Sequence, residues 1–133
     1  SISAGAYTTA DDYAALVLMH LRDGMCGDEQ VLSSESLDRM HEDRVARVYG
    51  GSNEGTDADG NLTGTVFGYG LGWNVDREAG YLASASPFGQ QAWLDLDNGY
   101  GVLLLLEATW QNSLDLYDLV PGPLHEAVLT ARG

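Results

Sequence analysis

The chemically most informative part of the chain is a run of small residues that ends in Pro, Phe and Gly: Ser84, Ala85, Ser86, Pro87, Phe88 and Gly89. A small-residue strand that stops at Pro and Gly exposes backbone N–H groups at a sheet edge. Such groups can stabilise an oxyanion during acyl transfer, or bind an extended substrate by strand addition. An ordinary edge strand followed by a turn has the same residues, so the pattern alone leaves both interpretations open.

Three histidines, His20, His41 and His125, are the other obvious candidates for chemistry. They fall on three separate predicted helices and have no His-x-x-x-His spacing, so we interpret them as packed or surface side chains rather than zinc ligands. The N-terminal Ser1 has the residue type of a nucleophile in self-cleaved hydrolases, but a simple chain boundary explains it equally well.

One acidic segment has oxygen-bearing side chains at alternate positions, Asp57, Asp59 and Asn61, as a calcium loop requires. Gly68 stands where such a loop needs its bidentate Glu, and Leu62 stands where it needs Gly. We therefore expect a plain Asp-Gly turn, with calcium binding as the weaker alternative, and we expect no cofactor.

Composition excludes several classes of protein. The 133 residues include 20 acids and six Lys+Arg, all six of them Arg, which gives a net charge of −14. This charge repels nucleic-acid phosphate and anionic membrane, and no apolar run approaches the roughly 20 residues that span a bilayer. Without lysine, no mechanism that needs a Lys base or a Walker lysine is complete within the chain. A single Cys26 allows no internal disulfide and is interpreted as a spectator thiol.

Strands are predicted in the second half of the chain. Tyr69 to Val75 alternates large residues with glycine, which is typical of a strand with one packed face. Gln91–Asp95 is predicted as a second strand, and the apolar run Gly101–Leu106 as a third one that is covered on both faces. Asp97-Asn98-Gly99 indicates the hairpin turn between the last two. These features predict an antiparallel meander.

Helices are predicted before and after this meander in the sequence. The first should run from Ala10 to about Asp23, because Thr8 and Thr9 precede acids three residues on. Ser33 or Ser34 should cap a second helix. Pro123 suits the first position of a last helix, and the segment from residue 108 to 122 is either a short helix or a packed loop.

Six motifs then follow a familiar order: S-A-G-A-Y-T-T-A-D-D-Y-A, V-L-S-S-E-S-L-D-R-M, G-Y-G-L-G-W, S-P-F-G-Q-Q-A-W-L-D, V-L-L-L-L and a closing helix. Together they resemble the C-terminal portion of the β-lactamase-like serine hydrolases. This group includes class C β-lactamases, penicillin-binding DD-peptidases, related esterases and 6-aminohexanoate-oligomer hydrolases. The resemblance extends from Ala4 to Ala131.

The resemblance implies an α+β fold in which helices flank a mainly antiparallel sheet. In the family, the Ser of a Ser-x-x-Lys motif is the nucleophile, and Lys and a Tyr activate it. A third motif on a sheet-edge strand, Lys-Thr-Gly, His-x-Gly or Trp-Gly-Gly, lines the site. The nucleophile and base precede the matched region, so the resemblance implies no catalytic residue within this chain.

The chain departs from the family pattern in two ways. It has no Lys, and the third motif falls on Ser84-Ala85-Ser86 in one register or Tyr81-Leu82-Ala83 in a shifted one, neither of which contains a cation. A backbone N–H between Ser84 and Ser86 still suits an oxyanion hole, because that role needs no particular side chain.

We therefore expect residues 1–133 to form the C-terminal segment of a β-lactamase-like domain that hydrolyses an ester, amide or β-lactam. The expected partners are a small acyl substrate and the N-terminal portion of the same protein, or a second chain, which would supply the nucleophile. A non-catalytic relative that binds a peptide or another partner is the alternative. Because the helix at 10–23 and the strand at 101–106 both look two-sided, the isolated chain should expose an apolar patch.

Overall fold

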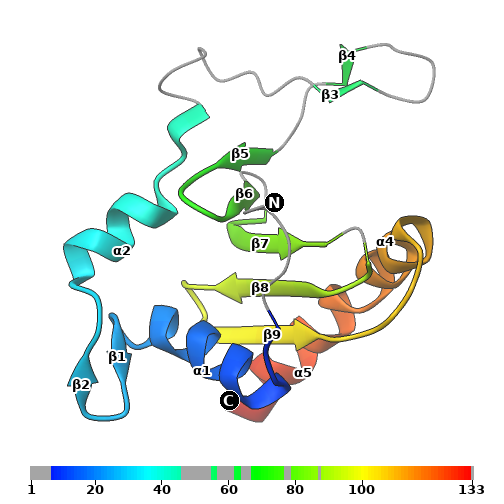
Figure 1. The fold of residues 1–133 in the computed structure, drawn as a ribbon. Helices are drawn as coiled ribbons and strands as arrows, with labels where there is room; N and C mark the ends of the chain where they lie inside the picture. Colours follow the sequence, from blue (N-terminus) through cyan, green and yellow to red (C-terminus); the bar gives the residue numbers. More distant parts are fainter. Residues whose placement is uncertain are drawn as a thin grey trace.

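The computed structural model describes residues 7–45, 55–56, 62–63, 67–76, 79–86 and 88–132. Helices and antiparallel sheets coexist in it, and the two faces of the largest sheet carry different helices (Figure 1). The predicted α+β class is confirmed. No helix in these ranges combines the length and the apolar character needed to cross a bilayer.

The largest sheet is a five-stranded antiparallel meander whose spatial order follows the chain. Its strands are β5 (Phe67–Tyr69), β6 (Asn74–Asp76), β7 (Tyr81–Ala85), β8 (Gln91–Asp95) and β9 (Tyr100–Leu104). The turn between β8 and β9 contains Gly99 at φ 62°, a conformation that glycine adopts without strain. This confirms the predicted hairpin.

Register decides which side chains face which helix. Leu82, Leu94 and Gly101 lie side by side across β7, β8 and β9, and they share one face of the sheet. Their chain neighbours Tyr81, Asp95 and Tyr100 are also in register, and so share the opposite face.

Helix α1 (Ala10–Leu21) covers the first face. Its N-cap is Thr9, whose side chain accepts the N–H of Asp12, as the sequence predicted. Val17, 5% exposed, packs into a core cluster with Leu94 and Leu82. The helix approaches β9 at Gly101, where the missing side chain makes room for Val17.

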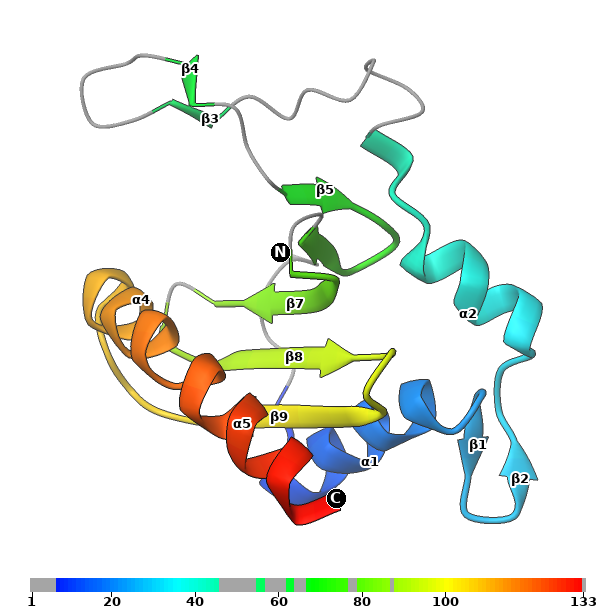
Figure 2. The ribbon, with the colours of Figure 1, turned by 180° about the vertical axis from the view of Figure 1, so that it is seen from behind.

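Helices α4 (Trp110–Leu119) and α5 (Pro121–Arg132) follow the sheet, and α5 lies on the face opposite α1 (Figure 2). The Arg132 guanidinium donates to the backbone oxygens of Asn98 and Gly99, which holds the end of α5 to the β8–β9 turn.

The segment from residue 108 to 122, predicted as a short helix or a packed loop, is helical over most of its length. The last helix starts at Pro121, two residues before the predicted Pro123, since Pro is equally suited to that first turn.

Two strand predictions need correction. The stretch from Tyr69 to Val75 is not one strand but the hairpin β5–β6, closed by a bond from Gly70 N–H to the Trp73 oxygen (2.8 Å). Gly72 has φ 90°, so the glycines that mimic a strand alternation in fact allow a turn. The third strand ends at Leu104 rather than Leu106.

The remaining elements lie between α1 and the sheet in sequence. They are β1 (Met25–Cys26), β2 (Glu29–Gln30), α2 (Ser34–His41), β3 (Gly55–Thr56) and β4 (Leu62–Thr63). Ser33 caps α2 by accepting the N–H of Ser36, as predicted. The candidate calcium residues Asp57, Asp59 and Asn61 lie outside the described residues.

Candidate functional site

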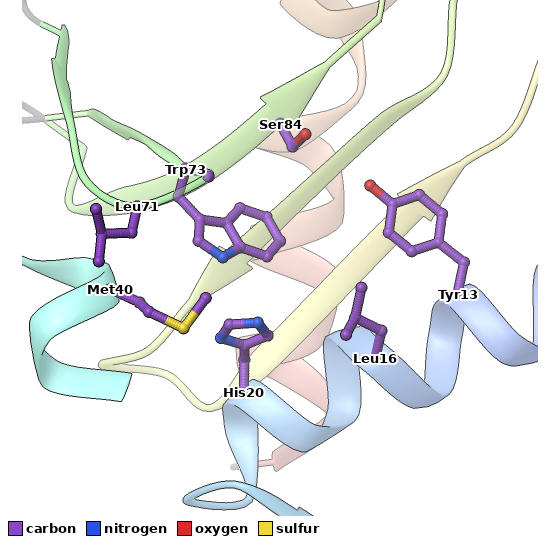
Figure 3. Close-up of a pocket in the computed structure, with 8 residues that line it drawn as sticks. Tyr13, Leu16, His20, Met40, Leu71, Trp73 and Ser84 are labelled. Carbon is purple, nitrogen blue, oxygen red and sulfur yellow. The ribbon is translucent and has the colours of Figure 1, made fainter. Parts of the chain in front are cut away.

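A hollow of about 230 Å³ opens between α1, α2, the β5–β6 turn and β7 (Figure 3). It is lined by Tyr13, Leu16, His20, Met40, Leu71, Gly72, Trp73 and Ser84. Most of these side chains are apolar or aromatic, while Ser84 and His20 are polar. A mostly apolar hollow with a few convergent polar groups is the usual form of a small-molecule site.

Helical and strand periodicity bring these residues together. Tyr13, Leu16 and His20 follow one another at intervals of three and four along α1, so they share the helix face turned to the sheet. Ser84 is in register with Ala92, a member of the core cluster on the α1 face, and its side chain points to the same side. Trp73, 5% exposed, lies between the helix and Ser84 (Figure 3).

Helix α2 contributes to the hollow through its contact with the β5–β6 turn. Leu71 N–H donates to the Met40 oxygen at 2.8 Å. Gly70 approaches the same oxygen so closely that a Cβ at this position would overlap it. A further bond, from Tyr69 N–H to the Asp43 carboxylate, is longer at 3.4 Å. The position of α2 therefore determines where Met40 and Leu71 stand at the rim.

Only part of the predicted segment faces this hollow. Ser84 lines it, whereas the Phe88 side chain is 67% exposed and is not among the lining residues. The N–H groups of Ser86, Phe88 and Gly89 are used within the turn, where they bond to the Gln90 oxygen and to oxygens of Ser86. Gly89 has φ 103° and is the glycine this turn requires. Pro87 lies outside the described residues.

The strand that carries this segment is not at the edge of the sheet. β7 is the third of five strands, with β6 on one side and β8 on the other. However, the pairing with β6 extends only to the pair Asn74–Ala83, while the pairing with β8 continues to Ala85–Gln91. The end of β7 is therefore paired on one side only.

The hydrogen bonds between β7 and β8 show which backbone N–H groups at this end of β7 point away from β8. In an antiparallel pair, residues alternately point their N–H groups to one neighbour and to the other. The bond from Ser86 N–H to the Gln90 oxygen (2.9 Å) sets that alternation, so Ala85 points its N–H away from β8. If the β6–β7 register is continued, the residue opposite Ala85 is Gly72, which lies in the turn and lines the hollow. The backbone N–H of Ala85 thus points to the β6 side of the strand, toward the turn that contains Gly72.

The structure brings together two of the histidines that seemed unrelated in the sequence. His20 Nδ1 and His41 Nε2 lie 2.8 Å apart, and the His20 ring meets Trp73 edge-on at a centroid distance of 5.1 Å. Burial, with a smaller effect from His41, lowers the pKa of His20 from 6.5 to about 4. Burial also lowers the pKa of His41, and nearby Asp38 partly opposes this. Both rings are therefore neutral at pH 7.

The third histidine belongs to a separate polar cluster on the α5 face. His125 Nδ1 lies 3.1 Å from the Tyr100 hydroxyl and 3.5 Å from both the Tyr81 hydroxyl and the Asp95 carboxylate. Asp95 is 2% exposed and also accepts two bonds from Asn98. This cluster joins α5 to the sheet, and its residues do not line the hollow of Figure 3.

The histidine contacts also bear on Ser84. In the described part of the chain, His20 Nδ1 pairs with His41 and His125 Nδ1 with tyrosine hydroxyls, and no hydrogen bond joins either ring to the Ser84 hydroxyl. Within the same residues, no three His, Cys, Asp or Glu side chains gather as a metal site requires. Cys26 is exposed. Among the described residues, the hollow thus combines a mostly apolar lining with the Ser84 hydroxyl and the His20 ring.

Most of the lining residues carry only the sequence signals of packing side chains. Tyr13, Leu16 and His20 had a visible signal, because they share one helix face. Trp73 and Met40 line the same hollow because α2 contacts the β5–β6 turn, and the sequence carries no local signal for that contact. Searches with the whole sequence matched no protein-family model and no curated protein.

Proposed function

We propose that this chain forms one wall of an acyl-transfer site in a serine hydrolase of the β-lactamase-like kind. The observation that carries the proposal is an apolar hollow beside the end of β7 that extends beyond the pairing with β6. The Ala85 N–H is directed toward Gly72 at the hollow, and Ser84 and Trp73 line it. A backbone N–H beside an apolar hollow is suited to hold the carbonyl oxygen of an ester, amide or β-lactam.

The nucleophile of such an enzyme would come from outside these residues. The chain contains no lysine, so a Ser-x-x-Lys pair is impossible within it. Ser84 lines the hollow, but among the described residues no hydrogen bond joins its hydroxyl to a histidine. The N-terminal portion of the same protein, or a second chain, would supply the serine and its base, and this chain would position the acyl group.

Exposed apolar side chains on α1 and on the turn support the presence of a covering partner. Leu16, Leu18 and Leu71 are 46%, 51% and 49% exposed, and two of them line the hollow. A rim of this kind is ordinary where another element completes a site, because burial there removes apolar surface from water. The same rim also fits the alternative, a non-catalytic relative that binds a peptide along the free end of β7.

Kinetics of the complete enzyme with a chromogenic ester or cephalosporin would test the proposal. Ser84→Leu adds bulk inside the hollow, so kcat/KM should fall by about tenfold or more while folding is retained. Phe88→Ala is the matched control, because Phe88 belongs to the same segment but is largely exposed, and it should change kcat/KM by less than about twofold.

Equal rates for Ser84→Leu and the unmodified enzyme would remove the hollow from the reaction. Loss of peptide affinity without any measurable turnover of esters, amides or β-lactams would favour the binding module instead.

A further inference from the structure

The His20–His41 pair joins α1 directly to α2, and it lies between two hollows. His20 also lines the hollow described above. On the other side, a second hollow of about 170 Å³ is lined by His20, Leu21, Asp23, Leu37, Asp38, His41 and Leu96. A change in this contact therefore reaches both spaces.

The contact depends on the protonation of the two rings. An imidazole–imidazole hydrogen bond needs one ring nitrogen with hydrogen and one without. The neutral pair satisfies this condition at 2.8 Å, and a singly protonated pair can also do so. When both rings are protonated, two N–H groups and two positive charges face each other, and the bond is lost.

The surroundings favour the neutral pair. His20 is 5% exposed, and its ring meets the Trp73 ring edge-on. Leu37 of α2 is 3% exposed and lines the second hollow. The charged side chains that face the pair are Asp38 of α2 and Asp23 after α1, both at the rim of the second hollow. Asp38 partly opposes the effect of burial on the pKa of His41, but burial is the larger effect for both rings, so a double positive charge is poorly accommodated.

Helix α2 is linked directly to the wall of the first hollow. Met40 precedes His41 and lines that hollow, and its backbone oxygen accepts the N–H of Leu71. If His41 moves away from His20, the end of α2 that carries Met40 moves with it.

We propose that the His20–His41 pair is a pH-operated latch, whose double protonation releases α2 from α1 and displaces the Met40–Leu71 side of the hollow. The inference concerns this contact alone, and it holds whether or not the hollow serves acyl transfer. Because folding lowers the pKa of both rings, the latch is closed at pH 7 and opens as the pH falls from 6.5 toward about 4.

Amide hydrogen exchange of the 133-residue chain, corrected for intrinsic rates, measures the opening at pH 7 and pH 4. We expect protection of the α2 amides at residues 34–41 to fall by about tenfold at pH 4. The amides of β8 and β9 should keep their protection, which separates latch opening from general acid unfolding of this acidic chain.

Three variants isolate the histidines from the many carboxylates. His41→Gln leaves only one titratable ring at the contact and the double variant His20→Phe/His41→Phe leaves none, so neither can become doubly protonated. Each should therefore reduce or abolish the loss of α2 protection between pH 7 and pH 4. His125→Gln, on the α5 face, should leave the loss as it is in the unmodified chain. Equal α2 protection at the two pH values overturns the proposal, and so does a loss that persists undiminished in both contact variants.

Discussion

At the level of single residues, the buried polar groups follow from local chemistry once their neighbours are known. Asp95 and Tyr100 are nearly inaccessible, at 2% and 7% exposed, and both meet His125 on the α5 face. A buried hydroxyl or carboxylate without partners would destabilise the fold, and the contacts of Tyr100 and Asp95 within this cluster offset the cost of burying them. The sequence could place Asp95 at the end of one strand and Tyr100 just before the next, but not His125 beside them, because the path of α5 over the sheet is a long-range feature.

Tyr100 gives a prediction at this scale. Burial, with smaller effects from the hydrogen bond to Tyr81 and the charge of Asp95, raises its pKa well above the ordinary value of 10.0. A raised pKa in the folded state means that the stabilisation is present below pH 10 and is lost as the pH rises beyond it.

Urea unfolding at pH 8 and pH 10.5 should therefore show a drop in the free energy of unfolding that is smaller in Tyr100→Phe. At pH 8 the same variant should lose about 1 kcal/mol through the missing hydrogen bond. Tyr7→Phe, at a fully exposed position, is the control. An identical alkaline drop in the unmodified chain and in Tyr100→Phe would show that Tyr100 does not titrate as its burial implies.

At the level of elements, the parts with local signals were predictable and the parts defined by contact were not. Thr9 and Ser33 cap their helices through bonds three residues away, and the Asn98-Gly99 turn joins adjacent strands, so each is readable in sequence. The β5–β6 hairpin was misread, because glycine at alternate positions fits both a one-faced strand and a tight turn. The close approach of Gly70 to the Met40 oxygen favours the turn over the strand. This contact joins residues 30 positions apart, so it is not readable from local sequence.

The α1–sheet contact at Gly101 gives the prediction at this scale. A Cβ at this position would lie 2.6 Å from Val17 Cγ1 and 3.0 Å from Leu94 Cδ2, so Gly101→Ala forces the helix or the core side chains to move. Overpacking of this kind typically costs about 1–3 kcal/mol in the free energy of unfolding.

Gly122→Ala is the matched control for this substitution. Gly122 lies within α5 with no atom near its missing Cβ, so alanine should leave stability unchanged or raise it by roughly 0.5–1 kcal/mol. Chemical denaturation of both variants makes the comparison. Equal stability of the two variants would mean that α1 does not pack on β9 as described.

At the level of the whole molecule, sequence and structure agree on the α+β class and on an antiparallel meander with a helix on each face. The sequence also pointed to the neighbourhood of Ser84 as the place for chemistry. It could not identify the hollow, because that space is defined by α1, α2 and the β5–β6 turn meeting around Trp73. Nor could it tell which of Ala85 and Ser86 points its N–H away from β8, because that alternation is known only once the strand pairing is known.

The central claim is that this chain shapes an acyl site whose attacking hydroxyl belongs to another segment. Fluorophosphonate labelling, read by peptide mass spectrometry, compares the complete enzyme with the isolated 133 residues. The account predicts one labelled serine in the complete enzyme, outside the sequence Ser1–Gly133, and no stoichiometric label on the isolated chain. A stoichiometric label on Ser84 or on any other serine of these 133 residues would contradict it.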